Sequence, residues 1–138
     1  MTKRVLVAGP AFPRTPAHAL NLREAINRNL PYVLGVGGIV LAEDTVTGQI
    51  AREWAARHGV SFCAHRAFDV AANELQIHVA YSGLWSDRMR EMVRQRNQRM
   101  IEEKAVTRAL LFVGTNECTD FITGLREPPR NVEIIRVA

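Results

Sequence analysis

Three turns that contain glycine follow apolar runs of the sequence and are the first candidates for a ligand site. The residues concerned are Gly9, Pro10, Gly37, Gly38, Gly114, Thr115 and Asn116. Glycine lets backbone N–H groups approach a phosphate, and a helix that begins beside the turn adds positive potential. We therefore predict that the three turns lie at one edge of a sheet and bind an anionic, nucleotide-like ligand. The sequence has no strict GxGxxG or Walker A pattern, which argues against a standard dinucleotide or NTPase site.

The segment from Arg96 to Met100 combines a cation and an amide at helical spacing. Met89, Val93, Asn97 and Met100 recur at intervals of three or four residues, so Asn97 falls on an otherwise apolar helix stripe. An amide in that position must find hydrogen-bond partners. Two interpretations stay open. Asn97 makes a structural hydrogen bond to a loop backbone, or it fixes a ligand loop while Arg96 donates a bidentate pair of hydrogen bonds to an anionic group.

A second chemistry that the sequence allows is cleavage or exchange of an N-glycosidic bond. This reaction needs a carboxylate beside the anomeric carbon, as nucleophile or acid. Glu117, Asp120 and Glu43 are the candidate catalytic residues, with Asp44 as a fourth. For Glu43 and Asp44 the alternative is a polar helix start with no catalytic role.

Metal and thiol chemistry are not expected from the spacing of the cysteines and histidines. Cys63 and Cys118 lack the CxxC spacing of metal and redox sites, which favours two idle thiols. His18 and His58 have no cysteine or carboxylate partner at metal-ligand spacing, and His65 borders a segment with no clear pattern. We therefore predict neither a metal site nor a cofactor.

Alternating strands and helices are predicted to position these residues. Apolar runs predict strands at residues 3–9, 32–36, 60–64, 110–114 and 132–137. Amphipathic spacing, with Thr15 and Gly59 as caps, predicts helices at residues 16–28, 47–58, 86–104 and 118–125. We predict one Rossmann-like α/β domain over residues 1–138, with a parallel sheet of roughly five strands and helices on both faces. Ligands of such sheets bind outside the carboxyl ends of the strands, where the strand order reverses.

Two stretches in the second half of the chain carry a family resemblance. RNQRMIEE at residues 96–103, followed by ALLFVGTNECTDFI at residues 109–122, resembles the DUF2493 (YspA-related) branch of the SLOG superfamily. Upstream, VGG at residues 36–38 and IAREWAARHGV at residues 50–60 are similar to the same family. The resemblance covers most of the chain and implies a Rossmann-like fold that binds nucleotides or their derivatives. The superfamily also contains the lonely-guy phosphoribohydrolases and the DNA-processing protein DprA.

The chain departs from the lonely-guy enzymes at the position of their catalytic glutamate. Those enzymes carry PGGxGTxxE, whereas residues 113–121 read VGTNECTDF, so Phe121 stands where the glutamate would be. The DUF2493 branch commonly has an aspartate one residue earlier, which Asp120 matches. The opening VLVAGPAF at residues 5–12 resembles the first strand of the nucleoside 2-deoxyribosyltransferases, whose fold is related.

The composition is that of an ordinary globular protein, with 138 residues of which 47% are hydrophobic and 23% charged. No apolar run approaches the ~20 residues of a membrane span, and the first residues lead into a strand pattern instead of a signal peptide. We therefore expect a cytoplasmic protein with no membrane partner.

The net charge of +4 favours anionic ligands. The basic residues between positions 88 and 108 fit a solvated helix face better than a nucleic-acid site, because no aromatic residue is interleaved with them.

Three functions remain open at this point. The first is a sensor or carrier that binds a nucleotide-derived small molecule, the second an N-glycosidic hydrolase or transferase, and the third DNA binding of the DprA type.

We also predict a homodimer, because residues 66–85 carry more apolar surface than a short crossover needs. The apolar residues of this segment are Phe68, Leu75, Ile77, Val79, Tyr81, Leu84 and Trp85.

Overall fold

The chain folds around a sheet of parallel strands. A computed structural model describes residues 3–12, 15–33, 37–68, 87–112, 116–127 and 132–137. Within these residues the strands are β1 (Arg4–Ala8), β2 (Ile39–Ala42), β3 (Phe62–His65), β4 (Val106–Phe112) and β5 (Glu133–Val137). They pair in the order β3-β2-β1-β4-β5, and every pair is parallel. The strand order therefore reverses after β1, which has β2 on one side and β4 on the other.

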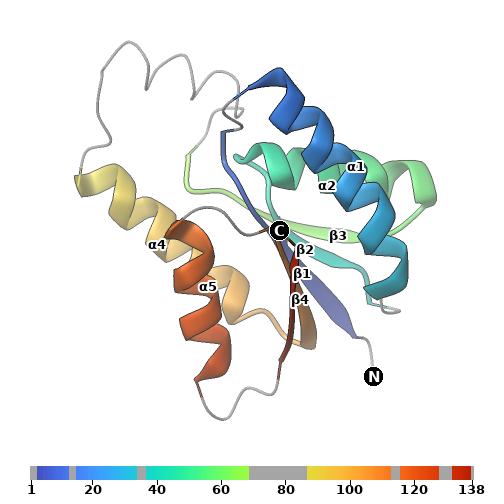
Figure 1. Ribbon diagram of the computed structural model, residues 1–138. Helices are drawn as coiled ribbons and strands as arrows, with labels where there is room; N and C mark the ends of the chain where they lie inside the picture. The colour runs from blue at the N-terminus through green and yellow to red at the C-terminus, as the bar shows by residue number, and fades with distance from the viewer. Residues whose placement is uncertain are drawn as a thin grey trace.

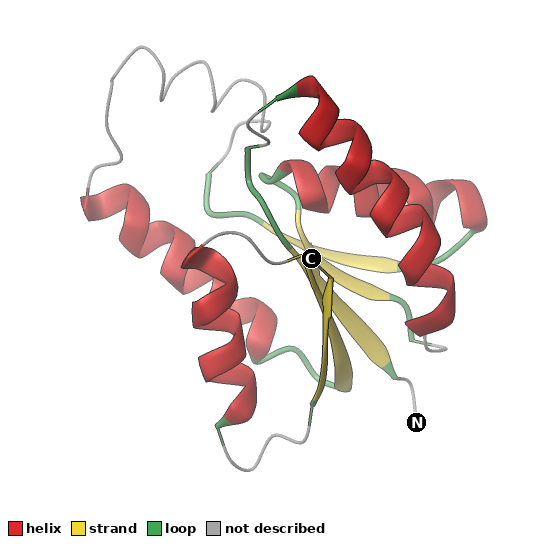
Figure 2. Cartoon of the chain, in the orientation of Figure 1, coloured by secondary structure: helices red, strands yellow, loops and turns green. Residues whose placement is uncertain are grey.

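Helices cover both faces of the sheet. They are α1 (Pro16–Val33), α2 (Val46–His58), α4 (Asp87–Ile101) and α5 (Asn116–Arg126). Helices α1 and α2 lie on one face, and α4 and α5 lie on the other (Figure 1). Figure 2 shows the same three layers, with the strands between the two pairs of helices. The predicted fold class, a single Rossmann-like α/β domain with a five-stranded parallel sheet, is confirmed.

Alternation along the central strand β1 builds two separate cores. Val5 and Val7 point toward α1 and α2, where they join Trp54 in one buried cluster. Leu6 and Ala8 point toward α4 and α5 and join a second cluster. Successive side chains of a strand point to opposite faces, so a strand covered on both faces must be apolar throughout. This requirement explains the unbroken apolar run that begins the chain.

The second strand lies later in the sequence than the pattern predicts. The pattern predicts a strand at residues 32–36, but α1 continues to Val33 and β2 begins at Ile39. Pro31 cannot donate the helical hydrogen bond, which makes it look like a helix end. Leu30, however, extends the buried stripe of α1, and burying one leucine contributes about 1.5–3 kcal/mol, which offsets that loss.

The predicted helix caps are confirmed where the structure describes them. The backbone N–H of His18 donates to Thr15 Oγ1 at 3.0 Å, as expected at the start of α1. Gly59 ends α2 in the left-handed region, with φ 64°, and its N–H donates to the Ala55 carbonyl.

The outer face of α4 carries mixed charge, as predicted. Arg94 pairs with Glu91 at 2.8 Å, and Arg88 and Arg90 are exposed. Arg96 is the exception, because it is buried. Among the described helices, none has the length and apolar character needed to cross a membrane.

Candidate functional site

The carboxyl ends of β1 and β4 meet where the strand order reverses. Ala8 of β1 lies beside Leu111 of β4. Gly9 and Pro10 follow β1 and are buried. A Cβ atom at Gly9 would lie 2.8 Å from Thr47 Oγ1 and 2.9 Å from Phe112 Cβ. Glycine is thus required here because α2 and β4 pack against the backbone, which is a steric reason independent of any ligand.

The loop that follows β1 is tied to the beginning of α2. Thr47 Oγ1 donates to the Pro10 carbonyl at 2.8 Å, and the N–H of Val46 donates to the Ala11 carbonyl at 3.0 Å. Thr45 Oγ1 accepts the N–H of Gly48 at 2.9 Å. The first amides of α2 therefore bind groups of the protein itself. These amides are therefore not available to an anion bound at this edge.

Gly37 and Gly38 lie at the opposite edge of the sheet, which corrects the prediction that all three turns share one edge. They precede β2 instead of following a strand. The N–H of Gly37 donates to the Lys3 carbonyl at 2.6 Å, and the Gly38 carbonyl accepts from Val5. The error comes from the position of the second strand. The sequence pattern predicts a strand at residues 32–36, which Gly37 and Gly38 would follow, whereas β2 begins at Ile39. These two glycines cannot contact a ligand bound beside Gly9.

The third predicted turn is only partly described. Gly114 and Thr115 lie outside the described residues. Asn116, Glu117 and Asp120 lie in the first turns of α5, and their side chains are likewise outside the description. Their backbone position places the predicted ligand and catalytic residues of this segment directly after β4, next to the point where the strand order reverses.

A buried ion pair joins α4 to the turn that follows β2. Arg96 Nη1 lies 2.9 Å from Asp44 Oδ2, and the two side chains are 3% and 1% exposed. Arg96 Nε and Nη2 donate to Asn97 Oδ1 at 3.2 and 2.9 Å. The N–H of Ala67, after β3, also donates to Asp44 Oδ2, at 3.3 Å. The guanidinium of Arg96 thus binds a carboxylate and an amide of this chain, whereas one interpretation of the sequence assigned it to an anionic group of a ligand.

This cluster leaves two polar atoms unsatisfied. Within the described part of the chain, Asp44 Oδ1 and Asn97 Nδ2 are buried and have no hydrogen-bond partner. Burying such atoms costs about 1–3 kcal/mol each. The cluster therefore has one buried acceptor, Asp44 Oδ1, and one buried donor, Asn97 Nδ2, that no described residue satisfies.

Glu43, a predicted catalytic residue, is held by two arginines. Arg66 Nε donates to Glu43 Oε2 at 2.9 Å, and Arg52 pairs with Oε1. The hydrogen bond from Arg66 lowers the pKa of Glu43 below its usual value, partial burial opposes this, and the charges of Arg52 and Arg66 lower it further. Glu43 is therefore ionised at neutral pH and is unsuited to act as a general acid.

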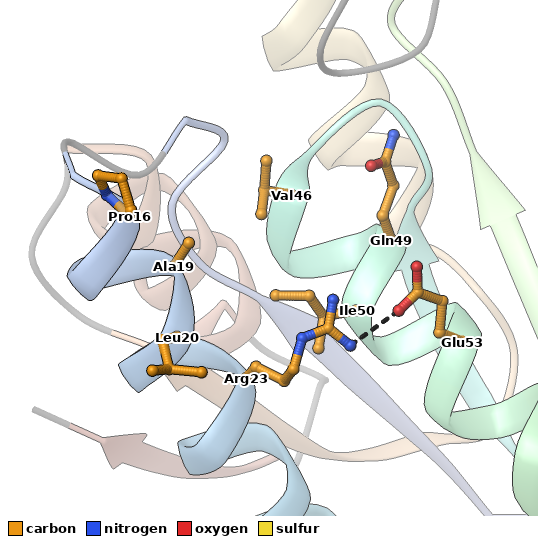
Figure 3. Close-up of a pocket in the computed structure, with 8 residues that line it drawn as sticks. All are labelled: Pro16, Ala19, Leu20, Arg23, Val46, Gln49, Ile50 and Glu53. Atoms are coloured by element: carbon orange, nitrogen blue, oxygen red, sulfur yellow. Dashed lines mark hydrogen bonds and ion pairs between the residues drawn. The ribbon is translucent and has the colours of Figure 1, made fainter.

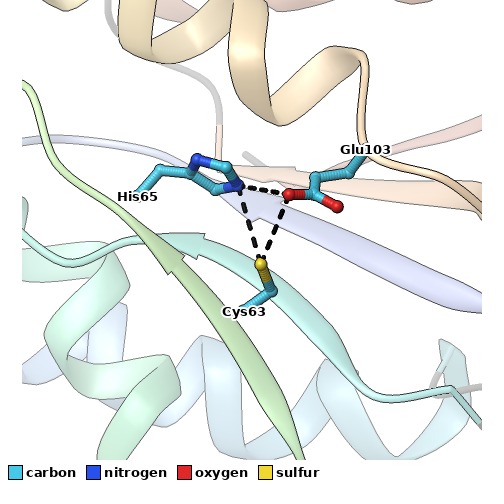
Figure 4. Close-up of side chains that lie close together, drawn as sticks. All are labelled: Cys63, His65 and Glu103. Carbon is cyan, nitrogen blue, oxygen red and sulfur yellow. Dashed lines mark hydrogen bonds and ion pairs between the residues drawn. The ribbon is translucent and has the colours of Figure 1, made fainter.

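A second polar cluster, which the sequence did not lead us to expect, lies on the α4 side of the sheet near its β3 edge. Cys63 and His65 of β3 converge with Glu103, which follows α4 (Figure 4). His65 Nε2 lies 2.8 Å from Glu103 Oε1, and Cys63 Sγ lies 3.3 Å from the same oxygen. Burial raises the pKa of the Cys63 thiol, as do the hydrogen bond and charge of Glu103, while Arg4 opposes them. The signal that we overlooked is the Cys-x-His spacing, which places both side chains on one face of a strand.

A shallow groove of about 300 Å³ lies between the first turns of α1 and α2 (Figure 3). Its wall is mainly apolar, and the ion pair of Arg23 and Glu53, 2.9 Å long, crosses it. The groove is on the outer side of these helices and does not include the ends of β1 and β4. The two charged side chains that line the groove are paired with each other, which makes them less available to a ligand.

Comparisons of the chain with family models, curated proteins and solved structures gave no match.

Proposed function

We propose that this protein binds a nucleotide-derived small molecule, as a sensor or carrier, in the crevice between the carboxyl ends of β1 and β4. The observation that carries the proposal is the reversal of strand order at β1. The loops after β1 and β4 lead to α1 and α5, which lie on opposite faces of the sheet. In open parallel sheets, ligands bind in the crevice that opens between two such loops.

The start of α5 is the proposed phosphate-binding element. A helix begins at Asn116, directly after Gly114 and Thr115, and the amides of a first helical turn attract anions. The amides at the start of α2 are already used by the loop after β1, so they do not compete for the ligand. The resemblance to the DUF2493 branch of the SLOG superfamily supports the same ligand class.

Binding is favoured over N-glycosidic cleavage by the surroundings of the candidate carboxylates. Asp44 is buried against Arg96, and both carboxylate oxygens of Glu43 are bound by arginines, which weakens Glu43 as a nucleophile as well as an acid. Phe121, which stands where the lonely-guy enzymes carry a glutamate, is 2% exposed and belongs to the core beneath α5. Cleavage would have to depend on Glu117 and Asp120, and it stays the alternative proposal. DNA binding of the DprA type is a third, with the net positive charge as its main support.

A thermal-shift measurement with AMP tests the proposed site. Saturation at about 100 times Kd stabilises a protein by ~2.7 kcal/mol, which raises the melting temperature by several degrees. Thr115→Asp is expected to abolish this shift, because it places a negative charge directly before α5 that repels phosphate, and aspartate is favourable before a helix. Thr115→Ser keeps the cap without the charge, and Thr123→Asp adds the charge at an exposed site further along α5. Both controls should respond like the unaltered protein.

Equal AMP responses of Thr115→Asp and Thr123→Asp would refute binding at the start of α5. Recovery of intact AMP after incubation is the result expected of a sensor or carrier. Release of adenine would establish the N-glycosidic alternative instead. Binding of duplex or single-stranded DNA that weakens steeply as salt rises would favour the third proposal.

We further propose that the chain acts in the cytoplasm as a homodimer. The dimer proposal rests on the apolar residues of the 66–85 segment, of which residues 69–85 lie outside the described structure. Light scattering is expected to give twice the chain mass of 15.5 kDa. A mass that stays at 15.5 kDa at high protein concentration would end the dimer proposal and leave the ligand site untouched.

A further inference from the structure

We infer that Cys63, His65 and Glu103 form a zinc-binding site. The three ligand atoms, Cys63 Sγ, His65 Nε2 and a carboxylate oxygen of Glu103, all lie within 4.8 Å of one another. They lie on the α4 side of the sheet, against the edge strand β3, so the site is independent of the proposed nucleotide crevice.

The fold brings the three side chains together in two steps. Cys63 and His65 are two residues apart on β3, so both project from the same face of the sheet. Cys63 packs at the margin of the core beneath α4. Glu103 follows the end of α4 and is anchored there, because its N–H donates to the Met100 carbonyl at 3.2 Å. A helix end and a strand therefore fix the ligands from opposite sides.

The distances between ligand atoms are close to those of a tetrahedral zinc site. Zinc bonds of about 2.3 Å to sulfur and about 2.0–2.1 Å to nitrogen and oxygen place ligand atoms about 3.3–3.6 Å apart. Cys63 Sγ lies 3.7 Å from His65 Nε2 and 3.3 Å from Glu103 Oε1, which fits. His65 Nε2 and Glu103 Oε1, 2.8 Å apart, have to separate by about 0.5 Å to admit the ion.

The chemistry of the donors selects zinc over the abundant hard cations. Magnesium and calcium prefer oxygen ligands throughout, whereas a thiolate with an imidazole and a carboxylate is typical of zinc. One thiolate and one carboxylate balance the charge of the ion. Arg4 Nη1 lies 3.3 Å from Glu103 Oε2, so it orients the carboxylate while the other oxygen stays available.

The site is accessible to solvent. The side chains of His65 and Glu103 are 15% and 23% exposed, so solvent reaches them. The three ligands that the described residues provide fill three of the four positions of a tetrahedral zinc site, as the protein ligands of catalytic zinc sites do.

Cobalt substitution of the full chain tests the site. We expect one equivalent of Co²⁺ to bind with a thiolate-to-cobalt charge-transfer band in the near ultraviolet, and Zn²⁺ to displace it. Cys63→Ser should abolish the band. His65→Gln and Glu103→Gln should each weaken Zn²⁺ binding at least about 100-fold, since the loss of supporting residues alone costs about 10–100-fold.

Cys118→Ser and Glu102→Gln are the matched controls. Cys118→Ser removes a thiol from α5, away from the site, and Glu102→Gln removes the carboxylate of the residue next to Glu103. Both should bind Co²⁺ and Zn²⁺ as the unaltered chain does. Circular dichroism establishes that each variant is folded. The inference is overturned if the unaltered chain shows no charge-transfer band, or if the band survives Cys63→Ser or disappears in Cys118→Ser.

Discussion

Replacing Arg96 by methionine is expected to lower the free energy of unfolding by about 3–5 kcal/mol. Arg96 and Asp44 are almost wholly buried, and their ion pair joins α4 to the turn after β2. Without the guanidinium, the Asp44 carboxylate stays buried with the N–H of Ala67 as its remaining donor among the described residues. Asn97 loses the two hydrogen bonds that its carbonyl oxygen accepts. Urea denaturation followed by circular dichroism measures the change.

Arg94→Met is the matched control for this prediction. Arg94 lies on the same helix but is exposed and pairs with Glu91 on the surface, so its loss should cost at most about 1 kcal/mol. The double variant Arg96→Met with Asp44→Leu should recover much of the stability, because both buried charges are then gone. Equal effects of Arg96→Met and Arg94→Met would show that the buried pair does not exist.

Replacing Gly48 by alanine is expected to destabilise the fold by about 3 kcal/mol or more. Gly48 is buried in the first turn of α2, and a Cβ atom there would collide with the carbonyl group of Ala42 at the end of β2. Backbone atoms of β2, which is paired on both sides, cannot move aside as a flexible side chain does. The clash therefore either lifts α2 from the sheet or distorts the loop that the start of α2 holds.

Gly59→Ala provides the comparison for Gly48→Ala, since both variants add one methyl group to a glycine of α2 or its cap. A Cβ at Gly59 meets open space, so only its left-handed conformation, φ 64°, is penalised. That penalty is about 1–2 kcal/mol. Melting curves that place Gly48→Ala at or above the stability of Gly59→Ala would contradict the close contact of α2 with β2.

The sequence predicts the fold well where periodicity and caps agree. The apolar run of β1 and the caps at Thr15 and Gly59 are local signals, and the structure confirms each. The prediction of the second strand is wrong because a local sequence signal competes with burial. Pro31 suggests a helix end, but the position of Leu30 on the buried stripe of α1 decides the outcome.

The site is harder to predict, because its contacts join distant parts of the chain. Asp44 and Arg96 are 52 residues apart, and Cys63 and Glu103 are 40 apart. Composition and spacing show that such residues are present but not which of them meet. The spacing of the α4 stripe correctly places Asn97 among buried residues, but it identifies neither Arg96 as the donor to its amide oxygen nor Asp44 as the partner of Arg96.

The central claim is that a nucleotide binds between the ends of β1 and β4, and amide chemical shifts during an AMP titration test it most directly. The proposal predicts that the perturbed amides gather at residues 9–12 and 113–117, which flank the point of strand reversal. Perturbations confined to residues 16–23 and 46–53 would place the ligand in the groove between α1 and α2 and contradict the proposal. The absence of any perturbation with AMP would contradict nucleotide binding itself.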